Sequence, residues 1–292
     1  MNFLSKNIFI SLILALIPAA CFADWELNLP RGVTPFSQDI YDLHMYVLWI
    51  VCAIGVVVFG AMFYSIFVHR KSRGAKAANW HHSTKVEVLW TVIPFAILIA
   101  VAVPATKSLI MMEDVSNADM TIKVTGYQWK WHYDYIGEDV SFYSTIHKDS
   151  NVTRQRGSKL DPFSVDHYLR DVDNYLVVPT NKKIRFLTTA GDVIHAWWVP
   201  ALGWKRDAIP GFINESWALI QEPGVYRGQC AELCGKDHGF MPIVVEAVPE
   251  ADYLAWIAEK TEEKALVIND SKALEGINSV ALAEGKKIES GE

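Results

Sequence analysis

The chain has 292 residues, of which 51% are hydrophobic and 12% aromatic, and its formal net charge is −6. Its mean hydropathy of +0.14 is high for a soluble protein, and three apolar blocks with few charged residues crowd the first 112 residues. These values argue against a wholly soluble chain. They also argue against a protein that binds nucleic acid, because nucleic-acid-binding surfaces are basic.

The first apolar block, NIFISLILALIPAACFA, follows Lys6 and is short for a membrane span. It ends in Cys21-Phe22-Ala23, which places a small residue at each position that signal peptidase contacts. We therefore predict that residues 1–23 are a cleaved signal peptide. Cys21 leaves a second interpretation open, a lipoprotein cleavage site, although Pro18 stands where such a motif usually has an aliphatic residue.

The second and third blocks are long enough to cross a membrane. We expect transmembrane helices at about 41–68 and 86–111, within a segment that covers residues 24–112. The loop between them, 69–85, contains basic residues and no acidic one, so the positive-inside rule places it in the cytoplasm. The chain after residue 112 then faces outward, in agreement with a signal peptide. Its acidic character favours a basic partner protein, through a faster encounter.

Residues 113–249 are predicted to form an outward-facing all-β domain. The segment TIKVTGYQWKWHYDY alternates with a period of two, which predicts β structure with its aromatic residues on one face. Short β-rich runs separated by Gly and Pro follow, as is typical of a sandwich or barrel. The polar stretch 144–171 is expected to be a surface excursion. The acidic tail, 250–292, is expected to be partly helical or disordered.

One short segment, GQCAELCGKDHGFMP, concentrates soft metal ligands: Cys230, Cys234, His238 and Met241. A disulfide is one interpretation of an extracytoplasmic cysteine pair, and a zinc site would need only one more histidine. A thioether, however, is the usual weak ligand of copper. A mononuclear blue-copper site uses one cysteine, so two cysteines favour two coppers bridged by both thiolates. That arrangement requires a second histidine, and His195 in GDVIHAWWVP supplies it.

These motifs resemble subunit II of the haem-copper cytochrome c oxidases, which carries a dinuclear copper A centre. The resemblance covers nearly the whole mature chain, including GYQWKWHYDY, DVIHAWWVPALGWKRDAIPG and GQCAELCGKDHGFMPIVVEAVP. It implies a membrane helix hairpin that carries a cupredoxin-like barrel or sandwich. It also implies the copper ligands, with Glu232 acting through its main-chain carbonyl: His195, Cys230, Glu232, Cys234, His238 and Met241.

The resemblance also implies roles for residues outside the copper loop. Trp129 would be the point at which electrons enter from cytochrome c, although its period-two position beside Trp131 is by itself more typical of a core residue. Asp173 and Asp192 would dock the basic cytochrome, and Glu87 would mark the entrance of a proton path into subunit I. The side chain of Glu232 would reach a magnesium ion shared with subunit I.

The same resemblance implies the setting. The expected partners are subunit I, which bears haem and copper B, together with subunit III, cytochrome c and the lipid bilayer; no nucleic acid is expected. The expected location is the bacterial inner membrane, with the C-terminal domain in the periplasm. Oxygen reduction and proton pumping would belong to subunit I.

Three other protein classes share part of this pattern. A membrane-anchored copper chaperone would need a copper loop, but it would not need the tryptophan segment or the two-histidine, two-cysteine ligand set. The quinol-oxidase relatives keep the fold and lack the copper ligands, all of which are present here. Nitrous oxide reductase has a similar centre on a much larger soluble chain. We therefore expect an oxidase subunit that passes electrons from cytochrome c to haem.

Overall fold

The computed structural model describes residues 28–79, 81–264 and 266. The predicted signal peptide, with Cys21, and the tail beyond residue 266 lie outside the described residues. The chain divides into two compact units, Met1–Pro30 and Arg31–Glu292. Only residues 28–30 of the first unit are described, so the following account concerns the second.

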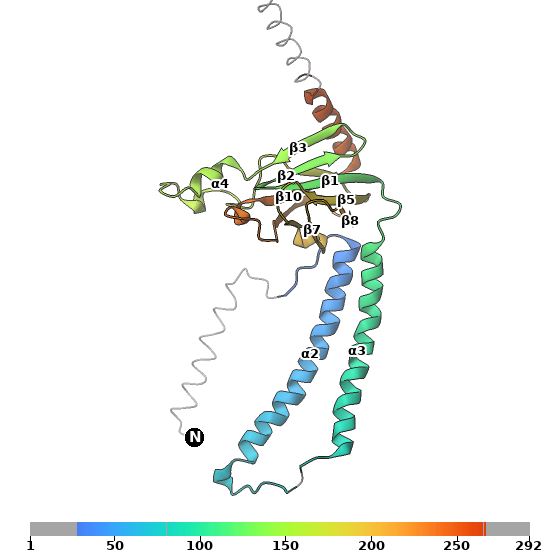
Figure 1. The fold of residues 1–292 in the computed structure, drawn as a ribbon, viewed down its shortest axis with the longest axis vertical. Coiled ribbons are helices and arrows are strands. Elements are labelled where there is room, and N and C mark those ends of the chain that lie inside the picture. Colours follow the sequence, from blue (N-terminus) through green and yellow to red (C-terminus); the bar gives the residue numbers. More distant parts are fainter. Residues whose placement is uncertain (1–27, 80, 265, 267–292) are drawn as a thin grey trace, which may run out of the picture. The chain divides into compact units, whose positions relative to one another are not determined.

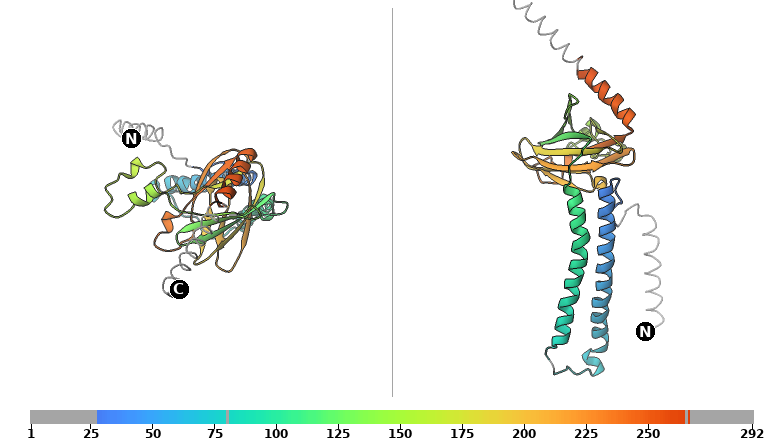
Figure 2. Two further views of the ribbon diagram at one scale, coloured as in Figure 1. Left: turned by 90° about the horizontal axis from the view of Figure 1, so that it is seen from above. Right: turned by 90° about the vertical axis from the view of Figure 1, so that its right-hand side faces the viewer.

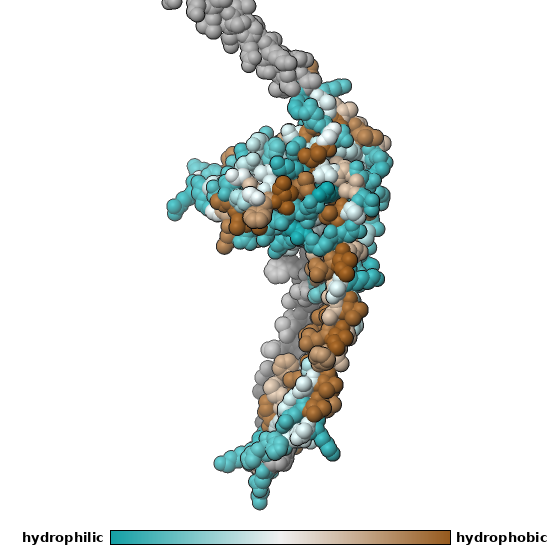
Figure 3. Space-filling view, turned by 45° about the vertical axis from the view of Figure 1, so that its right-hand side comes forward, coloured by the Kyte–Doolittle hydropathy of each residue, from teal (hydrophilic) through white to brown (hydrophobic). Residues whose placement is uncertain are grey.

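Two long apolar helices, α2 (Pro35–Val68) and α3 (Thr84–Glu113), are joined by a short loop that contains the 3-10 turn η1 (Lys71–Arg73). They run side by side (Figure 1), and each is long and apolar enough to cross a membrane. Apolar side chains gather along the helices, and polar ones surround the connecting loop (Figure 3). A hydrogen bond from Ser108 to Asp39 links the two helices.

Helix α2 begins earlier than the expected residue 41 because a capping box precedes it. The hydroxyl of Thr34 accepts a hydrogen bond from the Ser37 amide, and the hydroxyl of Ser37 accepts one from the Thr34 amide, each at 3.0 Å. Pro35 occupies the first helical position, where a missing N–H causes no loss. Thr34 also donates to the carbonyl of Leu202 at 3.0 Å, which fixes the start of the helix to the β domain.

The β domain contains three sheets. The five-stranded sheet has the order β3 (Val140–Ser144), β2 (Lys130–Tyr135), β1 (Met120–Tyr127), β5 (Lys183–Ala190), β8 (Asn214–Leu219). The three-stranded sheet is β4 (Leu176–Pro179), β10 (Pro242–Val248), β9 (Gly224–Gln229), and the two-stranded sheet is β6 (His195–Trp198) with β7 (Lys205–Ala208). The all-β fold is confirmed, and the sheets form an open sandwich, because among the described residues none of them closes into a barrel (Figure 1).

The aromatic segment is a hairpin. Trp131, Tyr133 and Tyr135 are buried on one face as expected, but Tyr127 and Trp129 do not share that face. Strands β1 and β2 pair antiparallel with Tyr127 opposite Lys130, so Gln128 and Trp129 form a two-residue turn around a cis peptide bond. Trp131 is buried opposite Gly126, on the other face from Tyr127. The sequence pattern predicted one continuous strand because the alternation of aromatic and polar residues continues through the turn, which contains neither Gly nor Pro.

Two further segments flank the sheets. The excursion contains α4 (Lys148–Thr153) and the turn η2 (Pro162–Ser164). Residues 250–264 are helical, and this helix lies against the five-stranded sheet, with the Trp256 ring centroid 5.4 Å from that of Tyr135 (Figure 2).

Candidate metal centre

The loop that contains the predicted copper ligands connects β9 to β10. These strands are antiparallel neighbours, with Gln229 opposite Pro242, so the two ends of the loop meet. The Cys230 amide donates to the Met241 carbonyl at 3.3 Å, and the Ala231 amide donates to the Ala196 carbonyl, next to His195, at 3.0 Å. Hairpin register therefore brings residues from both ends of the loop to the start of β6.

The two thiols at the centre are buried, unpaired and close together. The Sγ atoms of Cys230 and Cys234 are 3.9 Å apart, whereas a disulfide bond measures about 2.05 Å. Two sulfurs that share a tetrahedral metal at about 2.3 Å stand roughly 3.8 Å apart. The spacing thus fits a shared metal and does not fit a disulfide.

Each thiol is approached by one imidazole and one weaker ligand. Nδ1 of His195 lies 3.9 Å from Cys230 Sγ, and Nδ1 of His238 lies 3.5 Å from Cys234 Sγ. The Glu232 carbonyl is 3.5 Å from Cys230 Sγ, while the thioether of Met241 is 3.5 Å from Cys234 Sγ. All six predicted ligands converge, and the ligand atoms of His195 and the two cysteines lie within 4.8 Å of one another.

His195 is held by the core of the β domain. Its side chain is fully buried, its Nε2 lies 2.9 Å from the Asp192 carboxylate, and the Trp131 ring meets it edge-on at 5.9 Å between centroids. A Cβ at position 126 would lie 2.8 Å from His195 Cδ2, so only glycine leaves room for this ring. A metal-ligating imidazole commonly has such a carboxylate partner on its second nitrogen, which fixes the ring orientation.

The same environment separates the pKa values of the two thiols. Burial acts to raise the pKa of Cys230, but its hydrogen bonds with His195, with the backbone at Glu232 and Ala196 and with His238 together outweigh burial, and the pKa falls to about 7. Burial and the neighbouring Cys230 charge raise the pKa of Cys234 to about 12. One thiol therefore readily supplies the thiolate that binds metal.

The hairpin turn of β1 and β2 contacts the back of the loop. The Trp129 indole donates to the Cys234 carbonyl at 3.2 Å, and the Gln128 side chain donates to the same carbonyl at 2.9 Å. Lys236 lies over the Trp129 ring at 5.5 Å. Trp129 is thus a half-buried residue at the metal loop, and its predicted role remains a prediction.

Asp192 occupies a different environment from that of a free docking acid. Its carboxylate accepts from the Gln128 amide at 2.7 Å as well as contacting His195, and its side chain is 30% exposed. These contacts favour a role in holding the site. Burial acts to raise the pKa of this carboxyl, but the hydrogen bonds from His195 and Gln128 lower it.

The structure does not bring the remaining predicted residues to the metal loop. Asp173 is exposed and accepts hydrogen bonds from the amide and hydroxyl of Thr145 at 2.7 and 2.9 Å. Glu87 lies in the first turn of α3. The side chain of Glu232 is exposed, although its carbonyl faces the thiols. The roles of all three remain predictions.

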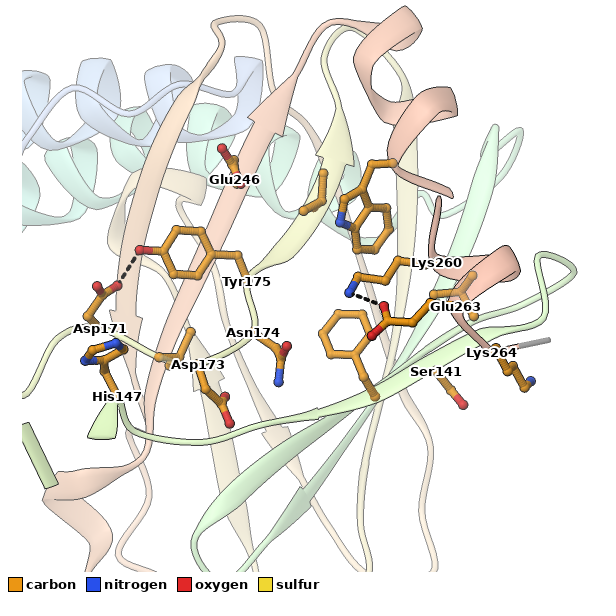
Figure 4. Close-up of a pocket in the computed structure, with 15 residues that line it drawn as sticks. Ser141, His147, Asp171, Asp173, Asn174, Tyr175, Glu246, Lys260, Glu263 and Lys264 are labelled. Carbon is orange, nitrogen blue, oxygen red and sulfur yellow. Dashed lines mark hydrogen bonds and ion pairs between the residues drawn. The ribbon is translucent and has the colours of Figure 1, made fainter. Parts of the chain in front are cut away.

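One cavity among the described residues is separate from the metal loop. It has a volume of about 750 Å³ and lies between β3, the segment around Asp173 and the C-terminal helix (Figure 4). The Tyr175 hydroxyl donates to Asp171 on one side, and Lys260 pairs with Glu263 on the other. No predicted copper ligand lines this cavity, so it is not the metal centre.

Sequence reasoning missed three residues at the centre: Gly126, Gln128 and Trp131. The only signal for Gly126 is a glycine inside a predicted strand, which often marks a close approach by another group. Trp131 donates to the Met241 carbonyl at 3.4 Å, a contact across 110 positions of the sequence that no local pattern reveals.

Comparisons with known proteins agree over both halves of the chain. The family of the cytochrome c oxidase subunit II periplasmic domain matches residues 120–248, and that of the subunit II transmembrane domain matches residues 23–108. The probable cytochrome c oxidase subunit 2 of Rickettsia bellii is 38% identical over 265 residues, 89% of this chain and 95% of that protein. Its counterpart in Rickettsia prowazekii is 42% identical over 262 residues, 88% and 80% of the two chains.

One of the solved structures similar to this chain is the periplasmic domain of subunit II of cytochrome oxidase from Bradyrhizobium japonicum. It is 41% identical to this chain, covers 51% of this chain and 98% of its own, and has a TM-score of 0.44.

Proposed function

The chain belongs to the cytochrome c oxidase subunit II family, and we propose that it carries electrons from cytochrome c to haem in subunit I through a dinuclear copper centre. As a member of that family it is a subunit of a haem-copper terminal oxidase. The observation that carries the proposal is the pair of buried thiols 3.9 Å apart, each faced by its own imidazole.

The donor set fits two coppers better than one zinc. Two thiols and two imidazoles would complete one tetrahedral zinc site and leave the buried Met241 thioether, 3.5 Å from Cys234 Sγ, without a purpose. With two coppers, Cys230 and Cys234 would supply the shared thiolates, His195 and His238 would each hold one copper, and Met241 and the Glu232 carbonyl would be the weak ligands. Bound there, the copper pair would supply one-electron redox chemistry.

The protein's part is to hold these ligands still. Backbone hydrogen bonds fix Cys230 and Ala231, and Asp192 fixes the His195 ring. The buried thiols are shielded from water. A rigid ligand set keeps bond lengths nearly constant when the charge changes, which favours rapid electron transfer.

We infer that electrons enter through Trp129. Its half-buried indole is hydrogen-bonded to the carbonyl of Cys234, so it joins the outside of the loop directly to a ligand residue. The acidic chain favours the approach of a basic cytochrome, and Asp173 is exposed to take part in docking.

The remaining assignments concern the setting of the subunit. Helices α2 and α3 anchor the chain, and we place the β domain on the periplasmic side of the bacterial inner membrane, with the basic loop 69–85 in the cytoplasm. The exposed side chain of Glu232 would hold a magnesium ion at the boundary with subunit I, and Glu87 would mark the entrance of a proton path. Subunit III completes the assembly.

The test is metal stoichiometry in the full chain, purified in detergent and loaded with copper. We expect two coppers per chain and an electron spin resonance spectrum in which one unpaired electron couples equally to both nuclei. The Cys234→Ser variant should lose this signal, while Cys52→Ser, in the membrane helix, should keep it. One copper per chain, or preferential retention of a single zinc, would contradict the proposal.

A further inference from the structure

The surface excursion is anchored firmly at its base. Ile146 forms a bridge with Val172, and the His147 amide donates to the Asp171 carbonyl at 2.9 Å. Helix α4 follows at once, and its Ser150 is fully buried and accepts a hydrogen bond from the Leu169 amide at 3.0 Å. These contacts fix the position of the C-terminal end of α4 relative to the β domain.

That end carries Arg154, whose guanidinium touches three groups. Its Nε donates to Asn151 at 2.9 Å, and a terminal nitrogen pairs with Asp237 at 3.3 Å. Its Cζ lies 4.2 Å from the centroid of the Phe240 ring. The side chains of Arg154 and Asp237 are only 18% and 23% exposed, so solvent screens this pair less than an exposed surface pair.

Asp237 and Phe240 bracket a predicted copper ligand. The turn η4 (His238–Phe240) begins immediately after Asp237, and His238 presents Nδ1 to Cys234 Sγ at 3.5 Å. Among the described residues, the His238 ring has no hydrogen bond to an oxygen or nitrogen atom, in contrast to His195, which has Asp192. The placement of the His238 ring therefore depends on the η4 turn that carries it.

We propose that Arg154 is a positioning residue for the proposed copper ligand His238. Its guanidinium contacts Asp237, just before the η4 turn, and Phe240, at the end of the turn, and so fixes the turn that carries His238. A planar guanidinium suits this role because one face stacks on the Phe240 ring while its edge donates to Asn151 and Asp237. The inference deepens the proposed copper function and rests on it. It also assigns the excursion a role, the support of the turn that carries His238, which the sequence of the excursion does not indicate.

The test compares variants of the full chain in detergent, loaded with copper. Arg154→Met removes the charge and the donors, while Arg154→Lys keeps the charge and loses the planar fork. Arg156→Met is the matched control, because Arg156 is an exposed neighbour in the same excursion. The measurements are the rate of copper loss to a chelator, the midpoint potential, and the couplings of the two histidine nitrogens by pulsed electron–nuclear double resonance.

Loss of an outer-shell partner typically weakens metal binding 10- to 100-fold. We expect Arg154→Met to lose copper roughly 10-fold faster than the unaltered chain, with a shifted potential and a change in one histidine coupling while the other is retained. Arg154→Lys should be intermediate and Arg156→Met unchanged. A merely structural role of Arg154 in the excursion would move neither the coupling nor the potential.

Unchanged copper retention and couplings in Arg154→Met would overturn the inference, as would equal changes at both histidines. If that variant fails to fold, Asp237→Asn tests the same pair from the loop side and leaves the bond between Arg154 and Asn151 in place; an unaltered centre there also overturns it. Failure of the proposed function is distinguishable, because it would appear as a missing two-copper spectrum in the unaltered chain.

Discussion

His195 and His238 occupy equivalent places beside the two thiols, but they are supported in different ways. His195 begins a strand, is fully buried and has direct contacts to Asp192 and Trp131. His238 lies half-buried on a short turn within a loop. One ligand is part of the domain core and the other is held from the surface, so a change at the first should disturb the fold and a change at the second only the metal centre.

Removing each imidazole gives the largest expected contrast. His195→Ala leaves a buried void and an Asp192 carboxylate without its partner, so we expect a loss of about 2–4 kcal/mol in the free energy of unfolding. His238→Ala should change it by less than about 0.5 kcal/mol. Urea unfolding of the copper-free full chain in detergent measures both. Equal losses would show that the two ligands are supported alike.

A single added methyl group sharpens the same comparison. In Gly126→Ala the new Cβ would lie 2.8 Å from the His195 ring, and overpacking of this kind typically lowers stability by about 1–3 kcal/mol. Gly239→Ala, next to His238, is the matched control, since its Cβ would meet nothing within 4 Å. We expect weaker copper binding only in the first variant, measured by competition with a chelator. If Gly126→Ala kept normal stability and copper binding, the side chains around His195 would have moved to accommodate the added methyl group.

The carboxylate behind His195 should have a smaller effect, confined to the metal. Asp192→Asn replaces a charged partner of the imidazole with a neutral one, and we expect roughly 10-fold weaker copper binding. Asp173→Asn should leave copper binding unchanged and slow the association of a basic cytochrome at low salt. Stopped-flow mixing separates the two effects. If Asp192→Asn instead slowed association and retained copper fully, Asp192 would be a docking residue.

Trp129→Gln should have the smallest effect on the centre itself. The Cys234 carbonyl keeps its hydrogen bond from Gln128 at 2.9 Å, so the copper spectrum should stay the same. Electron transfer from reduced cytochrome c should slow, because the indole is gone. Rapid-mixing kinetics and electron spin resonance on the same oxidase preparation check both expectations. Unchanged kinetics would refute the role of Trp129.

The convergence of side chains at the candidate metal centre could be predicted, because five of the six proposed ligands lie within one loop, where the chemistry is visible as local spacing. His195 followed from the need for a second imidazole. The hairpin could not be predicted, since the turn at Gln128 and Trp129 continues the period-two pattern.

Contacts that join distant parts of the chain were equally hidden. In the sequence, Asp192 resembles an ordinary surface acid. Only the fold places it between His195 and Gln128. Arg154 and Asp237 are separated by 83 positions, so no sequence spacing connects them. The start of α2, by contrast, could have been predicted from local sequence. Thr34, Pro35 and Ser37 form a capping signal, which a search for hydrophobic residues alone does not detect.

The closure of the copper loop has a consequence for the order of biogenesis. The bonds that close it, from Cys230 to the Met241 carbonyl and from Ala231 to the Ala196 carbonyl, join backbone atoms and involve no sulfur or imidazole nitrogen. The loop can therefore close before any metal binds, and the copper of the proposed centre can enter afterwards.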